Sequence, residues 1–388
     1  GMSRYLANLR TADIYTGLKK GVTNALQQVP VMGDRMIEHI RKTKSSIKQL
    51  VVPGMFFEDM GITYLGPIPG HNLPMLCKAL KEAKKVEGPV LLHVMTTKGK
   101  GYEPAETAPD KFHGIGPFDI ESGKVLAKKD GDTYTDVFGK VLCDEASRNP
   151  DIVAITAAMA DGTGLARFKK HYPNRFFDVG IAEEHGVTFA AGLAAGGLKP
   201  VFAVYSSFLQ RGYDQLIHDV ALQNLPVVLG VDRAGLVGSD GETHQGIFDL
   251  SFLSNIPNMT VMSPKNKWEL ADMLRFALQM NSPVAIRYPR GKAYDGYEGC
   301  REKISYGKSE WIFEGKEIAI LSVGHMFEEA VKTRDKLIEQ GYEPTLINMR
   351  FIKPIDEAMI EKVCQTHKLI AVIEENVQTG ACGEHVSE

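Results

Sequence analysis

Short apolar runs that alternate with helical segments constrain the fold of this 388-residue chain more than any other feature. Between residues 134 and 290 we expect six of these runs to be strands: Ile152–Thr156, Arg175–Val179, Pro200–Tyr205, Pro226–Val231, Met259–Met262 and Pro283–Arg287. Strands of this length, separated by segments long enough for a helix, are typical of parallel sheets buried on both faces. The sequence therefore predicts an α/β fold with doubly wound, mostly parallel sheets and helices on both faces.

The same alternation divides the chain into three predicted domains, 1–122, 123–296 and 297–388. The first contains a polar helical stretch at 36–50, followed by an amphipathic helix between two apolar strands, which predicts one parallel βαβ unit. The third alternates strand and helix again but is expected to be incomplete. Polar stretches at 122–133 and 291–307 have the composition of linkers.

An acidic pair and a histidine lie where one predicted strand passes into a helix. In the segment Asp178–Gly186, Glu183 is expected in the first helical turn, at the carboxyl end of a strand. Open α/β sheets keep their ligand sites at such ends, so this position suits catalysis. Taken alone, an acid in a first turn is equally typical of a helix-capping carboxylate.

Similar strings follow the other strand ends. They are IAEEHGVTFAAGLA (181–194), YSSFLQRGYDQ (205–215), DRAGLVGSDGETHQG (232–246) and RYPRG (287–291), with MTTKGKGYEPAE (95–106) nearer the N-terminus. In this order they resemble the pyrimidine-binding domain of transketolase-like thiamine diphosphate enzymes, and among these the 1-deoxy-D-xylulose-5-phosphate synthases above all. The resemblance extends over nearly the whole chain.

This resemblance implies the cofactor and the residues that activate it. Glu183 matches the glutamate that hydrogen-bonds the aminopyrimidine ring and promotes removal of a cofactor proton. Ile181 and Phe208 match neighbouring cofactor contacts, Phe208 stacking on the pyrimidine; from the residues alone, Phe208 is also consistent with a core phenylalanine. Mg²⁺ is implied too, but its ligands are expected in an N-terminal part that this chain lacks, so no metal ligand is assigned here.

The resemblance also implies the substrates, pyruvate and D-glyceraldehyde 3-phosphate. Three arginines match positions near the acceptor phosphate, and three other residues match positions near the reacting carbons; surface salt bridges or solvated loops are the alternative reading. The arginines are Arg211, Arg233 and Arg290, and the others are Tyr205, Asp240 and His244. His71 matches a catalytic histidine, but it lies in the string Pro-Gly-His-Asn (69–72), where the family has Asp-Gly-His-Asp. The loss of two carboxylates puts the usual orientation of His71 in doubt.

Composition limits the remaining choices. The formal net charge of −3 gives no electrostatic footprint for nucleic acid, and no apolar run is long enough to span a membrane. Five cysteines without a C-x-x-C pair argue against a disulfide scaffold or a zinc site, and they favour the cytoplasm.

The expected function is therefore a fragment or split subunit of a 1-deoxy-D-xylulose-5-phosphate synthase. The intact enzyme would decarboxylate pyruvate on thiamine diphosphate and join the two-carbon unit to the aldehyde, feeding isoprenoid, thiamine and pyridoxal biosynthesis. A homodimer, or assembly with a separate N-terminal half, is expected, and the chain alone should be inactive. The alternatives are another ketol transferase of the same class, a pyruvate dehydrogenase β-type subunit, or a non-catalytic subunit that dimerises with and regulates a complete paralogue.

Overall fold

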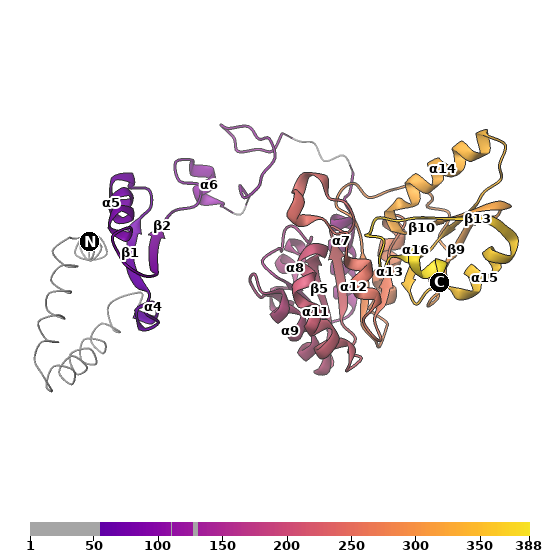
Figure 1. The fold of residues 1–388 in the computed structure, drawn as a ribbon, viewed down its shortest axis with the longest axis horizontal. Helices are drawn as coiled ribbons and strands as arrows, with labels where there is room; N and C mark the ends of the chain where they lie inside the picture. Colours follow the sequence, from indigo (N-terminus) through magenta and orange to yellow (C-terminus); the bar gives the residue numbers. More distant parts are fainter. Residues whose placement is uncertain (1–54, 110, 127–130) are drawn as a thin grey trace, which may run out of the picture. The chain divides into compact units, whose positions relative to one another are not determined.

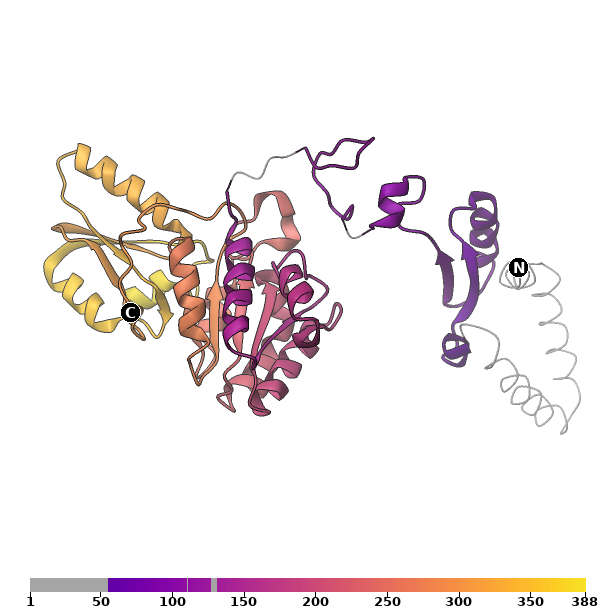
Figure 2. The same cartoon turned by 180° about the vertical axis from the view of Figure 1, so that it is seen from behind.

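Residues 55–109, 111–126 and 131–388 are described by a computed structural model, in which the chain divides into two units (Figures 1 and 2). Unit 1 holds the described residues up to 126, and unit 2 holds those from 131 onward. The predicted helix at 36–50 lies outside the described residues.

Unit 1 contains the predicted βαβ unit. Strands β1 (Thr63–Pro69) and β2 (Val90–Met95) pair in parallel, and helix α5 (Leu73–Ala83) connects them. A small apolar core lies between the helix and the strands: Ile68, Leu76, Ala79 and Leu92. Two short helices, α4 (Met55–Asp59) and α6 (Glu103–Thr107), flank this unit along the chain. The expected parallel pairing is confirmed.

Unit 2 is built around a seven-stranded sheet with the order β12-β7-β8-β6-β5-β3-β4. All neighbouring strands are parallel except β12, which pairs with β7 in the antiparallel direction. The strands are β3 (Ile152–Thr156), β4 (Phe176–Asp178), β5 (Lys199–Tyr205), β6 (Val228–Asp232), β7 (Thr260–Met262), β8 (Val284–Arg287) and β12 (Phe351–Lys353).

Helices cover both faces of this sheet because its strands are apolar on both sides. Along β5, Val201 and Ala203 contribute to one buried cluster, while Phe202 and Val204 contribute to the other. The first cluster packs on α7 (Tyr134–Arg148), α8 (Ala166–His171) and α13 (Lys267–Ala277). The second packs on α9 (Glu183–Ala195), α10 (Ser206–Leu209), α11 (Tyr213–Gln215), the π-helix η3 (Leu216–Ala221) and α12 (Asp249–Ser254).

A second, four-stranded sheet forms the C-terminal part of unit 2, with the order β13-β10-β11-β9. Its strands are β9 (Glu310–Phe313), β10 (Glu317–Ser322), β11 (Thr345–Asn348) and β13 (His367–Ile373), and β9 is antiparallel to β11. Its helices are α14 (Phe327–Glu339), α15 (Glu357–Thr366) and α16 (Cys382–Ser387). Short 3₁₀ turns complete unit 2: η1 (Pro173–Arg175), η2 (Gln210–Gly212), η4 (Gly238–Asp240), η5 (Glu242–His244) and η6 (Gly324–Met326).

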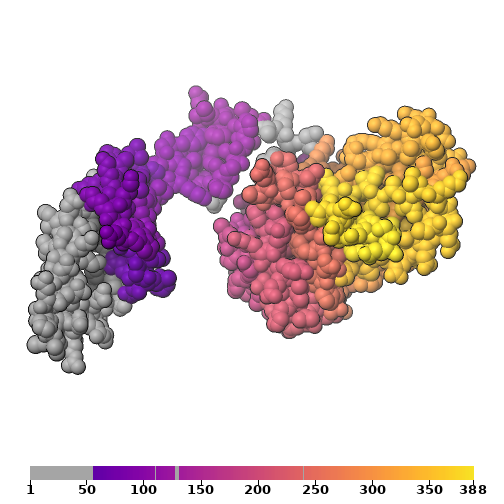
Figure 3. All heavy atoms as spheres, in the orientation of Figure 1, coloured from indigo at the N-terminus to yellow at the C-terminus, as the bar shows by residue number. Residues whose placement is uncertain are grey.

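The two sheets of unit 2 share a core. One buried cluster runs from β5 and α9 through to β10, β11 and α16, and in the space-filling view the yellow C-terminal part lies directly against the orange part before it (Figure 3). Strand β12 lies beyond β11 in sequence, yet it pairs with β7 of the larger sheet. The predicted boundary between residues 296 and 297 stays a prediction; β12, which lies after it in sequence, joins the sheet of the domain before it.

A buried ion cluster also crosses that boundary. Lys265 Nζ lies 3.1 Å from Glu269 Oε1 and 2.6 Å from Glu310 Oε2, and Arg350 contacts the same two carboxylates at 2.7 and 2.8 Å. Burial alone raises the pKa of Glu269, but Lys265 and Arg350 outweigh burial and hold that pKa below its usual value. The four charges balance, as buried charges in a stable fold must.

Among the described residues, no helix combines the length and apolar character needed to cross a bilayer.

Candidate functional site

The carboxyl ends of the parallel strands gather most of the predicted site residues at one edge of the larger sheet. Strands β4, β5, β6 and β8 end at Asp178, Tyr205, Asp232 and Arg287, and each end is followed by one of the polar strings. Ligand sites of open α/β sheets lie at this edge because the loops that leave the strands converge there.

Glu183 is the first residue of α9 and is almost completely buried, with 2% of its surface exposed. Its described hydrogen bond comes from the Arg211 guanidinium to Oε2 at a long 3.4 Å, and Arg211 itself is 58% exposed. The structure therefore places Arg211 beside Glu183. Ile181, in the turn before α9, is 77% exposed and contributes no core packing.

Three aromatic rings meet at the end of β5. The rings of Tyr205 and Phe208 stack with centroids 5.5 Å apart, and the His244 ring meets Phe208 edge-on at 5.1 Å. His244 also lies 6.3 Å from Tyr205. Burial raises the pKa of the Tyr205 hydroxyl, which keeps it a neutral hydrogen-bonding group.

A charge network continues from this aromatic group. The Arg233 guanidinium lies 4.1 Å from the centre of the Tyr205 ring, a cation–π contact. Asp240 accepts from Arg290 and lies 3.7 Å from Arg233 Nε, which makes no hydrogen bond of its own. Residues from three strand ends are thus joined in one continuous set of contacts.

A cavity of about 660 Å³ adjoins this network. Arg233 and Arg290 line it, together with Asp136, Asp161 and the backbone at 236–238. Asp136 belongs to the capping box of α7, where its carboxylate accepts from Thr133, so the helix start is already occupied by an anion. Arg233 and Arg290 are the positively charged residues among those that line this cavity.

Asp232 is a buried member of the site that the sequence interpretation did not assign. Its carboxylate contacts Arg233 NH1 at 3.0 Å and accepts from the Thr135 hydroxyl at 2.8 Å. Burial raises the pKa of Asp232 to about 6, against the lowering effects of Arg233 and Thr135. The signal was present in the sequence, because Asp232 precedes Arg233 at the end of a predicted strand.

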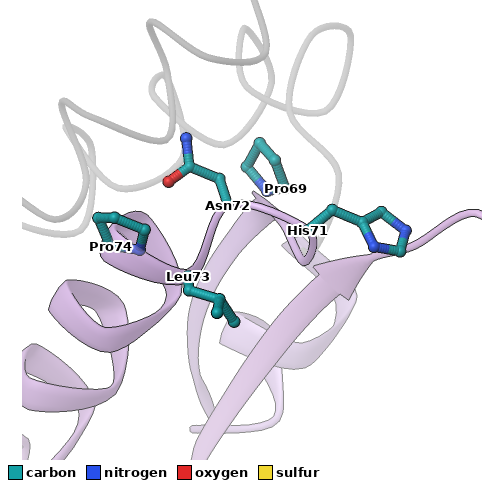
Figure 4. A pocket seen from close by; sticks show the side chains of 5 residues that line it. All are labelled: Pro69, His71, Asn72, Leu73 and Pro74. Carbon is teal, nitrogen blue, oxygen red and sulfur yellow. The ribbon is translucent and has the colours of Figure 1, made fainter. Parts of the chain in front are cut away.

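His71 lies in unit 1, in the turn between β1 and α5, and lines a second cavity of about 690 Å³ with Pro69, Asn72, Leu73 and Pro74. Its Nε2 accepts a hydrogen bond from the Thr97 amide at 2.7 Å. The Asn72 side chain accepts from the Met75 amide at 3.1 Å and so caps α5. In Figure 4 the imidazole and the Asn72 amide point to different sides of this turn. Asn72 therefore caps the helix, a role that aspartate fills equally well.

The string MTTKGKGYEPAE (95–106), which follows β2, makes hydrogen bonds within itself. The Glu106 carboxylate accepts from the Gly101 amide at 2.9 Å and from Lys100 at 3.3 Å, and the bond from Gly101 contributes most to a lowered pKa of Glu106. The described residues contain no group of three or more histidine, cysteine or acidic side chains arranged to hold a metal ion.

Comparison with known proteins identifies the class from three separate segments. Sequence models of protein families match the transketolase pyrimidine-binding domain at residues 131–294 and the transketolase C-terminal domain at 307–388. A third, 1-deoxy-D-xylulose-5-phosphate synthase, matches residues 1–96. The chain thus has the transketolase-like fold that its sequence predicted.

Solved structures agree on this fold. The structure described as "Split gene transketolase, inactive beta4 tetramer" covers 66% of this chain and 84% of its own, with a TM-score of 0.61 and 27% identity. A transketolase mutant from Pichia stipitis is 17% identical and covers 63% of this chain and 39% of its own, with a TM-score of 0.54. That second likeness shows the fold alone.

Curated relatives make the comparison more specific. A 1-deoxy-D-xylulose-5-phosphate synthase from Lachnoclostridium phytofermentans is 54% identical over 387 residues, and one from Caldanaerobacter subterraneus is 51% identical, each covering 100% of this chain. Over its whole length the chain is similar to 1-deoxy-D-xylulose-5-phosphate synthases. It spans 62% of the length of these relatives.

Proposed function

We propose that this chain provides the rear of the diphosphate-binding domain, the pyrimidine-binding domain and part of the C-terminal domain of a thiamine diphosphate-dependent 1-deoxy-D-xylulose-5-phosphate synthase. The reaction would decarboxylate pyruvate and join its two-carbon unit to D-glyceraldehyde 3-phosphate. The observation that carries this proposal is the continuous set of contacts among six predicted residues at one sheet edge: Tyr205, Phe208, Arg233, Asp240, His244 and Arg290.

The residues at this edge fit an aminopyrimidine ring. Glu183 is a buried carboxyl group whose described partner lies at a long 3.4 Å, so it retains capacity for a ring nitrogen. Phe208 offers a partly buried aromatic face, and the nearby Ser206 and Ser207 hydroxyls are buried without a hydrogen-bond partner. Buried polar groups of this kind usually find a partner in the functional state.

Thiamine diphosphate, when bound, would supply the carbon that accepts the two-carbon unit from pyruvate. Glu183 would hold a proton at the pyrimidine nitrogen, and Phe208 would stack on the ring. Tyr205 and His244 would donate and accept hydrogen bonds at the reacting carbons. We assign Ile181 a peripheral contact with the cofactor.

Arg233 and Arg290 would hold the acceptor phosphate, because guanidinium groups bind phosphate oxygens in pairs. Asp240 contacts both arginines in this structure, so phosphate binding requires at least one of these contacts to loosen. Arg211 contacts Glu183 in this structure, and we assign it a further contact with the same phosphate. His71 is proposed as a further catalytic residue, and Mg²⁺ and a dimeric assembly complete the proposed enzyme.

Complementation tests the function. The chain is mixed with a separately expressed diphosphate-binding segment of the Lachnoclostridium relative, and product is measured by mass spectrometry with pyruvate and the aldehyde. We expect 1-deoxy-D-xylulose 5-phosphate only when both polypeptides are present. The proposal fails if a stable complex of the two yields carbon dioxide and product no faster than either part alone.

Binding to the chain by itself is a second test. Stacking and one hydrogen bond leave the diphosphate charge unneutralised, so calorimetric titration with thiamine diphosphate and Mg²⁺ should give a Kd of about 1 mM or weaker, roughly −4 kcal/mol. Micromolar binding would mean that the chain holds a cofactor site beyond the residues assigned above.

A non-catalytic, assembling subunit is the second candidate. It is favoured by the likeness to the split-gene transketolase described as an inactive beta4 tetramer. Under this alternative, the chain would form a stable oligomer and change the rate of a complete synthase without turnover of its own. Sedimentation and mixed-enzyme assays separate the two candidates.

A further inference from the structure

Two consecutive acids after β13 point to different parts of unit 2. Glu374 accepts from the backbone amides of Cys382 and Gly383, at 3.0 and 2.7 Å, and so caps α16 within the C-terminal part. Glu375 reaches instead into the loop that follows β6. The two residues are adjacent in sequence, but the Glu374 carboxylate binds the start of α16 and the Glu375 carboxylate binds the loop after β6.

The Glu375 carboxylate is fixed at the start of the glycine-rich loop, which we define as residues 235–246. Its Oε2 accepts from the Leu236 amide at 3.1 Å and pairs with His325 Nε2 at 2.7 Å. A Cβ atom at Gly235 would lie 2.0 Å from this oxygen, so the carboxylate rests on the glycine backbone. Only about a fifth of either the Glu375 or the His325 side chain is exposed.

The backbone around Glu375 is held by the larger sheet. Arg287, at the end of β8, donates to the Glu375 carbonyl at 3.3 Å and forms a buried ion pair with Asp249 at 2.8 Å. Two residues further on, the Val377 amide donates to the Ile247 carbonyl at 2.9 Å. Burial alone raises the pKa of Glu375, but the His325 hydrogen bond and charge and the Leu236 amide outweigh burial and lower it, which favours the ionised acceptor.

The contact lies where the direction of the loop is set. Two backbone hydrogen bonds between Gly235 and Gly246, at 2.7 and 2.9 Å, close the loop, and Leu236 is the first residue inside this closure. The next residues line the cavity, and the loop then carries Asp240 to the arginines and His244 to the aromatic rings. Inside the loop, Gln245 accepts from the Val237 amide at 2.8 Å and donates to the Gly241 carbonyl at 2.9 Å, so the loop holds its own shape. Glu375 adds a contact that reaches the loop from the C-terminal part of unit 2.

We propose that Glu375, held by His325, is a positioning residue that fixes the glycine-rich loop and so places Asp240 and His244 against the cavity. The C-terminal part of unit 2 thereby contributes to the site without touching a ligand. The consequence for ligand binding rests on the proposed function, whereas the consequence for the loop does not.

Hydrogen exchange on the purified 388-residue chain tests the loop directly. Glu375→Ala should speed exchange of the Leu236 and Gly246 amides about tenfold or more, the usual effect of losing a hydrogen bond to a charged acceptor. Glu375→Gln should restore most of the protection, because its amide oxygen can still accept from Leu236. Glu374→Ala is the matched control, and it should speed exchange at Cys382 and Gly383 only.

Gly235→Ala provides an independent check. Its Cβ would meet the Glu375 carboxylate, and its backbone has φ of 79°, so the loop should again lose protection. In Gly235→Ala/Glu375→Ala the clash is relieved, so the combined loss should be clearly less than the product of the two single losses. Unchanged exchange at Leu236 in Glu375→Ala, or equal loss in Glu374→Ala, would overturn the proposal.

Inorganic phosphate probes the effect on the cavity. Glu375→Ala should weaken phosphate binding several-fold, with Glu375→Gln and Glu374→Ala close to wild type. If wild type binds no phosphate at up to 50 mM, about the limit of a simple titration, the phosphate role of the arginines is wrong while the exchange result still decides the loop. Loosened exchange with fully unchanged phosphate binding would overturn the claim that the loop places cavity residues.

Discussion

The strand-end site of unit 2 and the His71 turn of unit 1 are organised in different ways. In unit 2, side chains from three strand ends contact one another, and the buried Asp232 forms an ion pair with one of them, Arg233. In unit 1, His71 is exposed and is held by one described hydrogen bond from the next strand's end, while its neighbour Asn72 caps a helix. The first arrangement fixes a site within one unit. The second places a single histidine next to the capped start of helix α5.

The largest effect is expected at Glu183. Glu183→Gln keeps the volume of the side chain but removes the acid, so turnover of the complemented enzyme should fall about 100-fold or more. Exchange of the cofactor C2 proton, followed by NMR, measures this step alone. Glu184→Gln is the control, because Glu184 is the exposed neighbour in the same helical turn. If Glu183→Gln exchanged the C2 proton at the wild-type rate, Glu183 would not be the residue that promotes removal of this proton.

Asp232 should make the strand-end site sensitive to pH. Its pKa is raised to about 6 by burial, so the fold favours the protonated form, and stability is lost as pH rises from about 4 through 6. The side chain of Asp232→Asn cannot ionise, so the variant does not lose stability through this titration. The free energy of unfolding of the variant, relative to wild type, should therefore rise with pH by up to about 3 kcal/mol. Urea unfolding at pH 4.5 and 7.5 measures the difference, and a pH-independent difference would contradict a buried, titrating Asp232.

Arg290 tests the division of labour within the same site. Arg290→Ala should raise the KM for glyceraldehyde 3-phosphate about tenfold or more and leave pyruvate decarboxylation nearly unchanged, since only the acceptor carries phosphate. Arg301→Ala serves as control, because Arg301 is a surface arginine paired with Asp272. Equal losses for both substrates would point to a disturbed fold instead of a phosphate contact.

The smallest effect concerns the His71 turn. Asn72→Ala removes a helix cap and should reduce the local stability of α5 by about 1 kcal/mol, seen as roughly fivefold faster amide exchange near Met75. Asn72→Asp should keep the cap and its protection. Loss of protection in the aspartate variant would show that the asparagine has a role other than capping.

Most of the strands and their positions along the chain could be predicted from the sequence. Runs such as Ile152–Thr156 are apolar on both faces, and the structure has β3 over the same residues. β9 and β12 were missed, because one follows a stretch with linker composition and the other has three residues. Neither shows the periodicity on which such predictions depend. β12 is also recognisable only through its partner β7, which lies 89 positions earlier, counted from Met262 to Phe351.

Motifs pointed to several residues that the structure brings together at the strand ends, but Asp232, which begins one of these strings, was not assigned. Tyr205, Arg233 and Asp240 belong to strings that follow strand ends, and the structure brings them together. Glu375 lies in no such string, and its contact with Leu236 depends on how the C-terminal sheet packs. Sequence patterns predict which residues follow a strand end. They do not predict which distant residue, such as Glu375, will bind the backbone of the loop that follows.

The strand β12 and the buried cluster of Lys265, Glu269, Glu310 and Arg350 bear on how such a chain can be divided. A cut near residue 300 would leave the edge of β7 without its neighbour and would separate Lys265 and Glu269 from Glu310 and Arg350. The pyrimidine-binding sheet is therefore not a removable module. Gene fission, recombination or engineered exchange that separates the two sheets of unit 2 would lose both the β7–β12 pairing and this charge cluster.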